Sequence, residues 1–315
     1  MGWFLRRVAQ SLVMLWVVIS LVFLSIHFVP GDPAELLLSQ DGGSPDPLMV
    51  EMLREQLGLN RPLFEQYRHN MAGMLRGDLG VSMVDGSSVG KEVMRRLPRT
   101  LELIAAAGIL SLLIGIPAGV LSALRPKSQF SRIASMAAGT AQSVPVFVLG
   151  TLLVVVFAQI LGWLPAGGFA PISRDPGKHL LLLILPAATI AIGLSAIVFR
   201  ITRASMLDVL PLDFIRTARA KGVPARRVVI RHALRNALMP VITVFALQLG
   251  GLLAGTVLVE TVFNWPGLSG MLVAGVNARD YPVVTGVIVV VSAFYIGLNL
   301  LVDVIYGITD PRVRK

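Results

Sequence analysis

Residues 208–240 read DVLPLDFIRTARAKGVPARRVVIRHALRNALMP, a basic stretch between two long apolar runs. Pro211 and Asp213 are typical of a helix start, and Gly222 followed by Pro224 is typical of a stop and a restart. The stretch therefore predicts a helix of about eight residues, which is too short to be stable on its own in water. Because such a helix persists by packing against other structure, we expect it to be a docking element.

The predicted short helix has two different sides. Leu212, Ile215 and Ala218 fall on one side, because residues three apart are neighbours on a helix surface. The rest of its surface is basic, through Arg216, Arg219 and Lys221. Two interpretations are open at this point: a solvated loop that carries the usual cytoplasmic excess of Lys and Arg, or a basic helix that docks on a partner.

The composition places the chain in a membrane. Of its 315 residues, 55% are hydrophobic and only 15% are charged, and the mean hydropathy is +0.75. These values predict an all-α polytopic membrane protein. The net charge is +10, but the basic residues lie between apolar runs, which indicates cytoplasmic loops rather than nucleic-acid binding. The chain contains no cysteine, so disulfides and thiolate metal sites are excluded.

Six apolar runs predict six transmembrane helices. The first covers residues 8–29, and we interpret it as a retained span because no small-x-small cleavage site follows it. The other five cover approximately residues 101–121, 133–161, 180–199, 240–262 and 283–306. The Lys and Arg clusters then place both termini on the cytoplasmic side.

The apolar runs also predict a domain organisation. An N-terminal tail with the first span (1–29) is followed by a polar outer domain (30–98), a transmembrane core (99–307) that contains the basic loop 208–238, and a cytoplasmic tail (308–315). The outer position of the polar domain follows because long translocated segments escape the charge bias of short loops.

Small residues and a proline mark points of helix packing within these spans. Gly115 with Gly119, and Gly251 with Gly255, are pairs spaced by four residues, and we expect both to allow close helix packing. Pro145 lies in the middle of the third run and predicts a kink. The kink would either line a transport path or pack on a neighbouring helix.

The order of residues in the basic stretch resembles the EAA loop of binding-protein-dependent ABC importer permeases. Residues 216–222 (RTARAKG) and 231–237 (RHALRNA) have the form common in the branch for dipeptides, oligopeptides, glutathione and nickel chelates. Compared with the general family, Arg216 replaces a glutamate, Thr217 replaces an alanine, and Arg235 stands in place of a proline. These departures speak against a sugar or amino-acid permease.

Further segments are similar to the same branch: residues 30–33 (PGDP), 77–80 (GDLG), 264–268 (NWPGL), 279–282 (RDYP) and 310–314 (DPRVR). Ser269 departs from the pattern, because the family often has glycine there. The resemblance covers nearly the whole chain, and it implies the type I ABC importer permease fold with six transmembrane helices and an outer domain.

The resemblance implies a membrane-spanning subunit of an ATP-driven importer for peptides or glutathione in the bacterial inner membrane. The implied partners are a second homologous permease subunit, two cytosolic ABC ATPases that hold the ATP, and an extracytoplasmic substrate-binding protein. No cofactor is expected on this chain itself. The ATPases would bind the short helix through Asp213, Arg216, Thr217, Ala218, Lys221 and Gly222. Thr217, Ala218 and Gly222 would pack in the ATPase groove, with Arg216 and Lys221 at its rim.

The sequence offers no catalytic or metal-binding motif. Its four histidines (His27, His69, His179 and His232) are scattered, and neither a nucleophile elbow nor a complete phosphate loop is present. The candidates for a translocation path are Gln142, Ser143, Gln248 and Glu260. The first three would hydrogen-bond either to a peptide backbone or to other helices.

Two alternative functions remain open on the sequence. One is a nickel-chelate permease of the same branch, and the other is an ATP-independent secondary transporter. A secondary transporter predicts charged groups at mid-membrane depth, which the six apolar runs lack.

Overall fold

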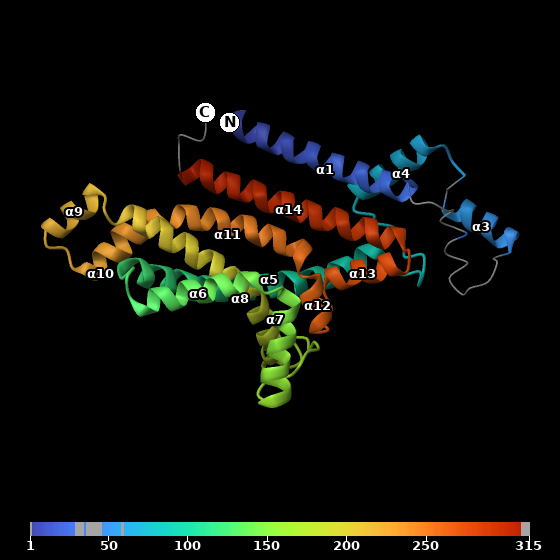
Figure 1. Ribbon diagram of the computed structural model, residues 1–315. Helices are drawn as coiled ribbons and strands as arrows, with labels where there is room; N and C mark the ends of the chain where they lie inside the picture. Colours follow the sequence, from blue (N-terminus) through green and yellow to red (C-terminus); the bar gives the residue numbers. More distant parts are fainter. Residues whose placement is uncertain (1, 29–34, 36–45, 58–59, 310–315) are drawn as a thin grey trace. The chain divides into compact units, whose positions relative to one another are not determined.

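The computed structural model describes residues 2–28, 35, 46–57 and 60–309, and nearly all of them that lie in regular structure are helical (Figure 1). The segments PGDP and DPRVR lie outside the described residues. The chain forms two compact units. Unit 1 contains Met1–Pro98 and Gly267–Lys315, and unit 2 contains Arg99–Pro266. Helix α5 (Val89–Leu124) runs from the first unit into the second.

Among the described residues, five helical stretches are long and apolar enough to cross a bilayer. They are α1 (Gly2–Phe28), α5, α8 (Pro176–Val209), the stretch Ala225–Leu253 that includes most of α11 (Arg235–Gly255), and α14 (Tyr281–Thr309). A sixth span results if the bent pair of α6 (Gln129–Ser143) and Val146–Ile160 is counted as one. The all-helical polytopic fold expected from the sequence is confirmed.

The third predicted span is sharply broken at Pro145. Helix α6 ends at Ser143, helix α7 (Val146–Leu153) and the π-helix η1 (Val154–Ile160) follow, and the two parts are bent by 107° (Figure 1). Val144 is extended, with φ −84° and ψ 125°, in keeping with the steric clash by which a proline ring disfavours the helical conformation at the residue before it. The kink predicted from Pro145 is therefore a full break between two helices.

The fifth predicted span also differs from its expected bounds of 240–262. The helical stretch begins upstream at Ala225, through α10 (Ala225–Arg227) and the π-helix η2 (Val228–Leu234), and it breaks at Thr256. A separate short helix, α12 (Val257–Val262), follows. Hydropathy missed the upstream part because Arg231 and Arg235 make this end of the helix polar, although charge at a helix end does not stop the backbone from continuing.

Unit 1 is built around α14. Helices α1 and α13 (Leu268–Asn277) both pack against α14, and α4 (Leu63–Leu75) contacts α1. Arg7 and Asp303 form an ion pair of 3.0 Å between α1 and α14. The described polar segment also contains α3 (Pro47–Leu57). The last loop of this polar segment is attached to Asp280. The Ser82 hydroxyl in the loop donates to the buried Asp280 carboxylate at 2.5 Å.

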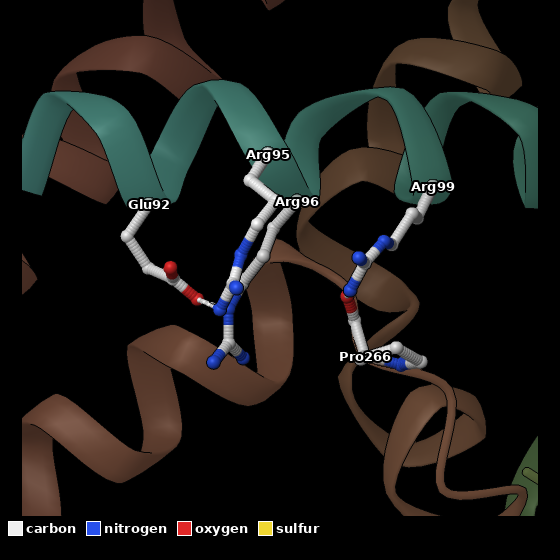
Figure 2. A network of polar contacts seen from close by, with 5 residues as sticks. All are labelled: Glu92, Arg95, Arg96, Arg99 and Pro266. Atoms are coloured by element: carbon white, nitrogen blue, oxygen red, sulfur yellow. Dashed lines mark hydrogen bonds and ion pairs between the residues drawn. The ribbon is translucent and has the colours of Figure 1, made fainter. Parts of the chain in front are cut away.

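The first turns of α5 carry a group of charged side chains on one side of the helix (Figure 2). The Glu92 carboxylate accepts from Arg95 at 2.7 Å and from Arg96 at 2.5 Å. These contacts are spaced three and four residues apart, so the group stabilises the helix that contains it. At the start of unit 2, Arg99 donates to the backbone carbonyl of Pro266 at 3.4 Å.

Helix α8 is the centre of unit 2, where α6, α7 and α11 all pack against it. A Cβ built at Gly115 or at Gly119 of α5 would lie 2.7 Å from the Cβ of Val198 or of Thr202 on α8. The predicted close packing of this glycine pair is confirmed. The same prediction for Gly251 and Gly255 is not met among the described residues, where nothing beyond their own helix backbone lies within 4 Å of either built Cβ. Small residues permit two helices to approach closely, but close packing also requires a second helix opposite the pair.

Candidate functional site

The short helix predicted in the basic stretch is α9 (Asp213–Ala220), which joins the ends of α8 and α10 (Figure 1). Asp213 occupies its first turn, where a negative charge is favoured by the helix dipole. The Thr217 hydroxyl donates to the Asp213 carbonyl at 2.9 Å. The predicted eight-residue helix is confirmed.

Gly222 ends this helix in the left-handed backbone conformation, which glycine adopts without strain because it has no Cβ. Its φ is +72°, its N–H donates to the Arg219 carbonyl at 3.0 Å, and the Val223 N–H donates to the Ala218 carbonyl at 3.2 Å. These two bonds form a Schellman motif, which uses the left-handed conformation to turn the chain away from a helix. The motif fixes the direction in which the chain leaves α9.

Two side chains attach α9 to the rest of unit 2. Ile215 is fully buried and Ala218 is 8% exposed, in a cluster that also contains Met206 of α8 and Ala233 of η2. Leu212 was expected on this buried side but is 46% exposed. Its backbone is extended at the N-cap, with ψ 150°, so its side chain leaves the line of the helix.

The remaining surface of α9 is exposed and basic, and we call it the basic face. It consists of Asp213, Arg216, Thr217, Arg219, Lys221 and Gly222, and beside it the exposed Phe214 and Ala220 add apolar surface. Of the six residues expected to couple to an ATPase, five therefore lie on this face, whereas Ala218 does not. Ala218 packs inside its own chain, so its placement differs from the expectation that it enters a partner's groove.

The second part of the site is a cavity of about 410 Å³ in unit 2, which we call the glutamine cavity. It lies among α6, α7, α8, α11 and α12, where the break at Pro145 turns α7 away from α6. Its polar lining is Gln142, Thr189 and Gln248. Two of the four path residues proposed from sequence, Gln142 and Gln248, are thus brought together.

Of the two polar atoms in the side-chain amide of Gln142, one has a hydrogen-bond partner within the described ranges and the other does not. Its Oε1 accepts from the guanidinium of Arg200 on α8. Its Nε2 is buried and has no hydrogen-bond partner among the residues that the structure describes. Buried polar groups are nearly always paired, so this amide donor at the wall of the cavity is open to water or to another molecule in the cavity.

The other two path candidates lie elsewhere. Ser143 is exposed, does not line the cavity, and donates to the Gly139 carbonyl within its own helix. Glu260 of α12 is only 1% exposed and accepts from the Thr100 hydroxyl at 2.8 Å. The sequence placed Glu260 near the outer end of the fifth run as a path candidate, but the structure buries it between α12 and α5.

A further polar cluster was not found from sequence. His179 Nε2 lies 2.6 Å from Glu102 Oε1, and Phe169 stacks edge-on against both His179 and Trp265. The guanidinium of Arg99 lies 4.4 Å from the centre of the Phe169 ring. These residues come from α5, α8 and two loops, so no local spacing in the sequence reveals them. Within the described part of the chain, no group of three metal-ligating side chains gathers.

A multi-helical membrane chain with a polar-lined cavity, and with a firmly attached short helix that presents a basic face, has the features of a transport permease. The particular family follows from comparison with known proteins. Residues 115–315 match the family described as binding-protein-dependent transport system inner membrane component, and residues 1–104 match its N-terminal part. The chain belongs to this family.

Named relatives match the chain over its whole length. It is 41% identical over 314 residues to the glutathione transport system permease protein GsiC of Escherichia coli O6:H1 (strain CFT073), with 100% of this chain and 99% of that protein covered. The proteins of the same name from Escherichia coli K12 and Shigella dysenteriae serotype 1 are each 40% identical, with the same coverage.

A solved structure, titled "Inward facing conformations of the MetNI methionine ABC transporter: CY5 native crystal form", is similar in fold. The TM-score is 0.51 at 19% identity, over 66% of this chain and 92% of that chain. At that identity the likeness shows the ABC importer permease fold alone. The chain is thus a multi-pass inner-membrane permease subunit, a transport component that works with ATPase and binding-protein partners.

Proposed function

We propose that this chain is one of two homologous membrane-spanning subunits of an importer for glutathione or short peptides. The relatives that match it over their full length are called glutathione transport system permeases, and its basic stretch has the form common in the peptide branch. In the proposed assembly, two cytosolic ATPases supply the energy, and a binding protein delivers the substrate from the outer side. Both termini of this chain then face the cytosol.

The observation that carries the proposal is the contrast between the two sides of α9. Ile215 is fully buried, whereas Arg216 and Thr217 beside it are exposed. One side of such a helix is packed on its own chain and the other side is open to a partner. When the partner displaces the exposed side, the helix moves as a rigid unit together with the residues on which it is packed. A partner that moves the basic face therefore moves the cluster beneath it, which includes Met206 of α8.

Helix α8 links this cluster to the glutamine cavity. Met206 lies near one end of α8, and Thr189, Gly193 and Ile197 of the same helix line the cavity. A displacement of α9 by ATP-driven closure of the ATPases would thus reach the cavity through one continuous helix. We infer that Gln142 and Gln248 belong to the translocation path, because both line this cavity.

The proposal is tested on the reconstituted importer with its ATPases and binding protein. The variant Arg216→Glu with Lys221→Glu reverses the charge of the basic face while leaving Ile215 in place. We expect it to lose ATPase co-purification and ATP-driven uptake of radiolabelled glutathione together. The matched control is Arg174→Glu, which changes an exposed arginine in the loop before α8.

The control importer should retain its ATPases and its uptake. A charge-reversed importer that still recruits the ATPases and transports glutathione would overturn the proposed role of α9. Uptake of a dipeptide in place of glutathione by the unaltered importer would instead correct the cargo and leave the role of α9 intact.

A further inference from the structure

Arg200 is an exposed arginine whose guanidinium contacts a residue that lines the glutamine cavity. It lies on α8 and donates to Gln142 Oε1 across the gap to α6. Across the described ranges, no carboxylate lies within ion-pair distance of it. Its one recorded side-chain partner is therefore a neutral amide, although guanidinium groups bind best to carboxylates through two parallel hydrogen bonds.

A neighbouring arginine shows that this arrangement is not a general property of the basic end of α8. Arg203, three residues further along, donates to the Ser122 hydroxyl at 3.1 Å, and Ser122 itself is buried and bonded to Ser131. Arg203 thus serves the packing of α8 on α5. Arg200, in contrast, contacts a residue of the cavity wall.

The cavity wall also offers hydrogen-bond donors that the chain does not use. The Nε2 of Gln142 is buried without a partner in the described part of the chain, and Gln248 lines the same cavity. Apart from Thr189, whose hydroxyl donates to the Leu185 carbonyl, the rest of the lining is apolar or glycine. It includes Gly193 and Gly255, whose built Cβ atoms meet nothing within 4 Å among the described residues. The lining therefore suits a small molecule that has amide groups along its length. Arg200 does not itself line the cavity, but its guanidinium reaches the lining residue Gln142, where an anionic group of that molecule would meet it.

We propose that Arg200 and Gln142 form a carboxylate-binding subsite of the glutamine cavity, which takes a free carboxylate of a transported peptide. This inference rests on the proposed function and names the group of the substrate that is recognised. Arg200 provides the charge and Gln142 orients its guanidinium. When the carboxylate arrives, the guanidinium turns from the Gln142 amide to the stronger acceptor.

The test uses the purified complex of permeases and ATPases in nanodiscs. The binding protein is left out, so that any bound ligand is bound by the permeases. Bound radiolabelled glutathione is displaced either by unlabelled glutathione or by glutathione whose two carboxylates are amidated. We expect the diamide to compete at least about 10-fold more weakly, because it cannot form the charge-assisted hydrogen bonds.

The variant Arg200→Gln should lose this preference and bind both competitors equally weakly. The control Arg203→Gln removes the same charge one turn away and should keep the preference. The variant Gln142→Leu should weaken the binding of glutathione with Arg200 still present. Size-exclusion chromatography shows that each variant complex is assembled.

Three results would each overturn the proposal: no glutathione bound by the unaltered complex, equal competition by the diamide, or an unchanged preference in Arg200→Gln. None of them affects the proposed function, because ATP-driven uptake with the binding protein present and ATPase recruitment by α9 are measured separately.

Discussion

The imidazole of His179 lies 2.6 Å from the carboxylate of Glu102, although 77 positions of sequence separate the two residues. The other ring nitrogen of His179 lies 2.7 Å from the Ala170 carbonyl. Because a carbonyl oxygen only accepts, that nitrogen carries a proton and donates. One buried histidine at the start of α8 therefore ties the loop 161–175 to α5.

Replacing His179 with leucine should destabilise unit 2 by about 1–3 kcal/mol, because it removes both hydrogen bonds of a buried imidazole, to Ala170 and to the partly exposed Glu102. Hydrogen exchange of loop 161–175 should increase at the same time. Thermal unfolding of the purified importer, together with exchange measured by mass spectrometry, checks both effects. In the control His69→Leu, the replaced histidine lies exposed on α4, and the change should be within about 0.5 kcal/mol. Equal effects in the two variants would contradict the role assigned to His179.

Replacing Gly222 with alanine should destabilise the end of α9 by roughly 1–2 kcal/mol, because a Cβ is disfavoured at φ +72°. The expected readout is weaker ATPase co-purification with a normally folded membrane region. Gly139→Ala is the matched control, since Gly139 is helical and nothing lies within 4 Å of its built Cβ. That substitution should be neutral or stabilising by up to about 1 kcal/mol.

Replacing Gly115 with alanine should force α5 and α8 apart, because the new Cβ would lie 2.7 Å from the Cβ of Val198. Overpacking of this kind typically destabilises a protein by about 1–3 kcal/mol. The melting temperature of the isolated chain in detergent measures it. Gly251→Ala should leave that temperature nearly unchanged, since its built Cβ meets nothing in the chain. A lower melting temperature in the Gly251 variant alone would reverse the assignment of the two glycine pairs.

Replacing Asp280 with alanine should release the loop 76–88 of unit 1. The Asp280 carboxylate is 3% exposed and accepts from the Ser82 hydroxyl and from the Met83 N–H. Loss of this buried acceptor is expected to cost about 1–3 kcal/mol and to open the loop to limited proteolysis. Asp85→Ala serves as control, because Asp85 is exposed in the same loop and its carboxylate bonds only within that loop, to Ser87 and Ser82. Cleavage that is equally fast in both variants would show that Asp280 does not anchor the loop.

The sequence predicted local features well when one segment contained all the information. The start and end of α9 follow from Asp213 and Gly222, and the break in the third span follows from Pro145, because helix initiation and termination depend on neighbouring backbone geometry. The close packing at Gly115 was also predicted. The identical spacing at Gly251 misled, because a small residue does not specify which helix approaches it.

The sequence by itself determined the membrane class, the helical spans and the two-sided basic helix, since composition and residue spacing fix how a segment meets lipid or water. Only the tertiary structure decided which polar groups meet. Gln142 and Gln248 share one cavity because α6 and α11, far apart in the chain, both pack against α8. Likewise, Glu260 and His179 are buried because distant helices close over them. Such encounters depend on how whole helices pack, and no short window of sequence contains that information.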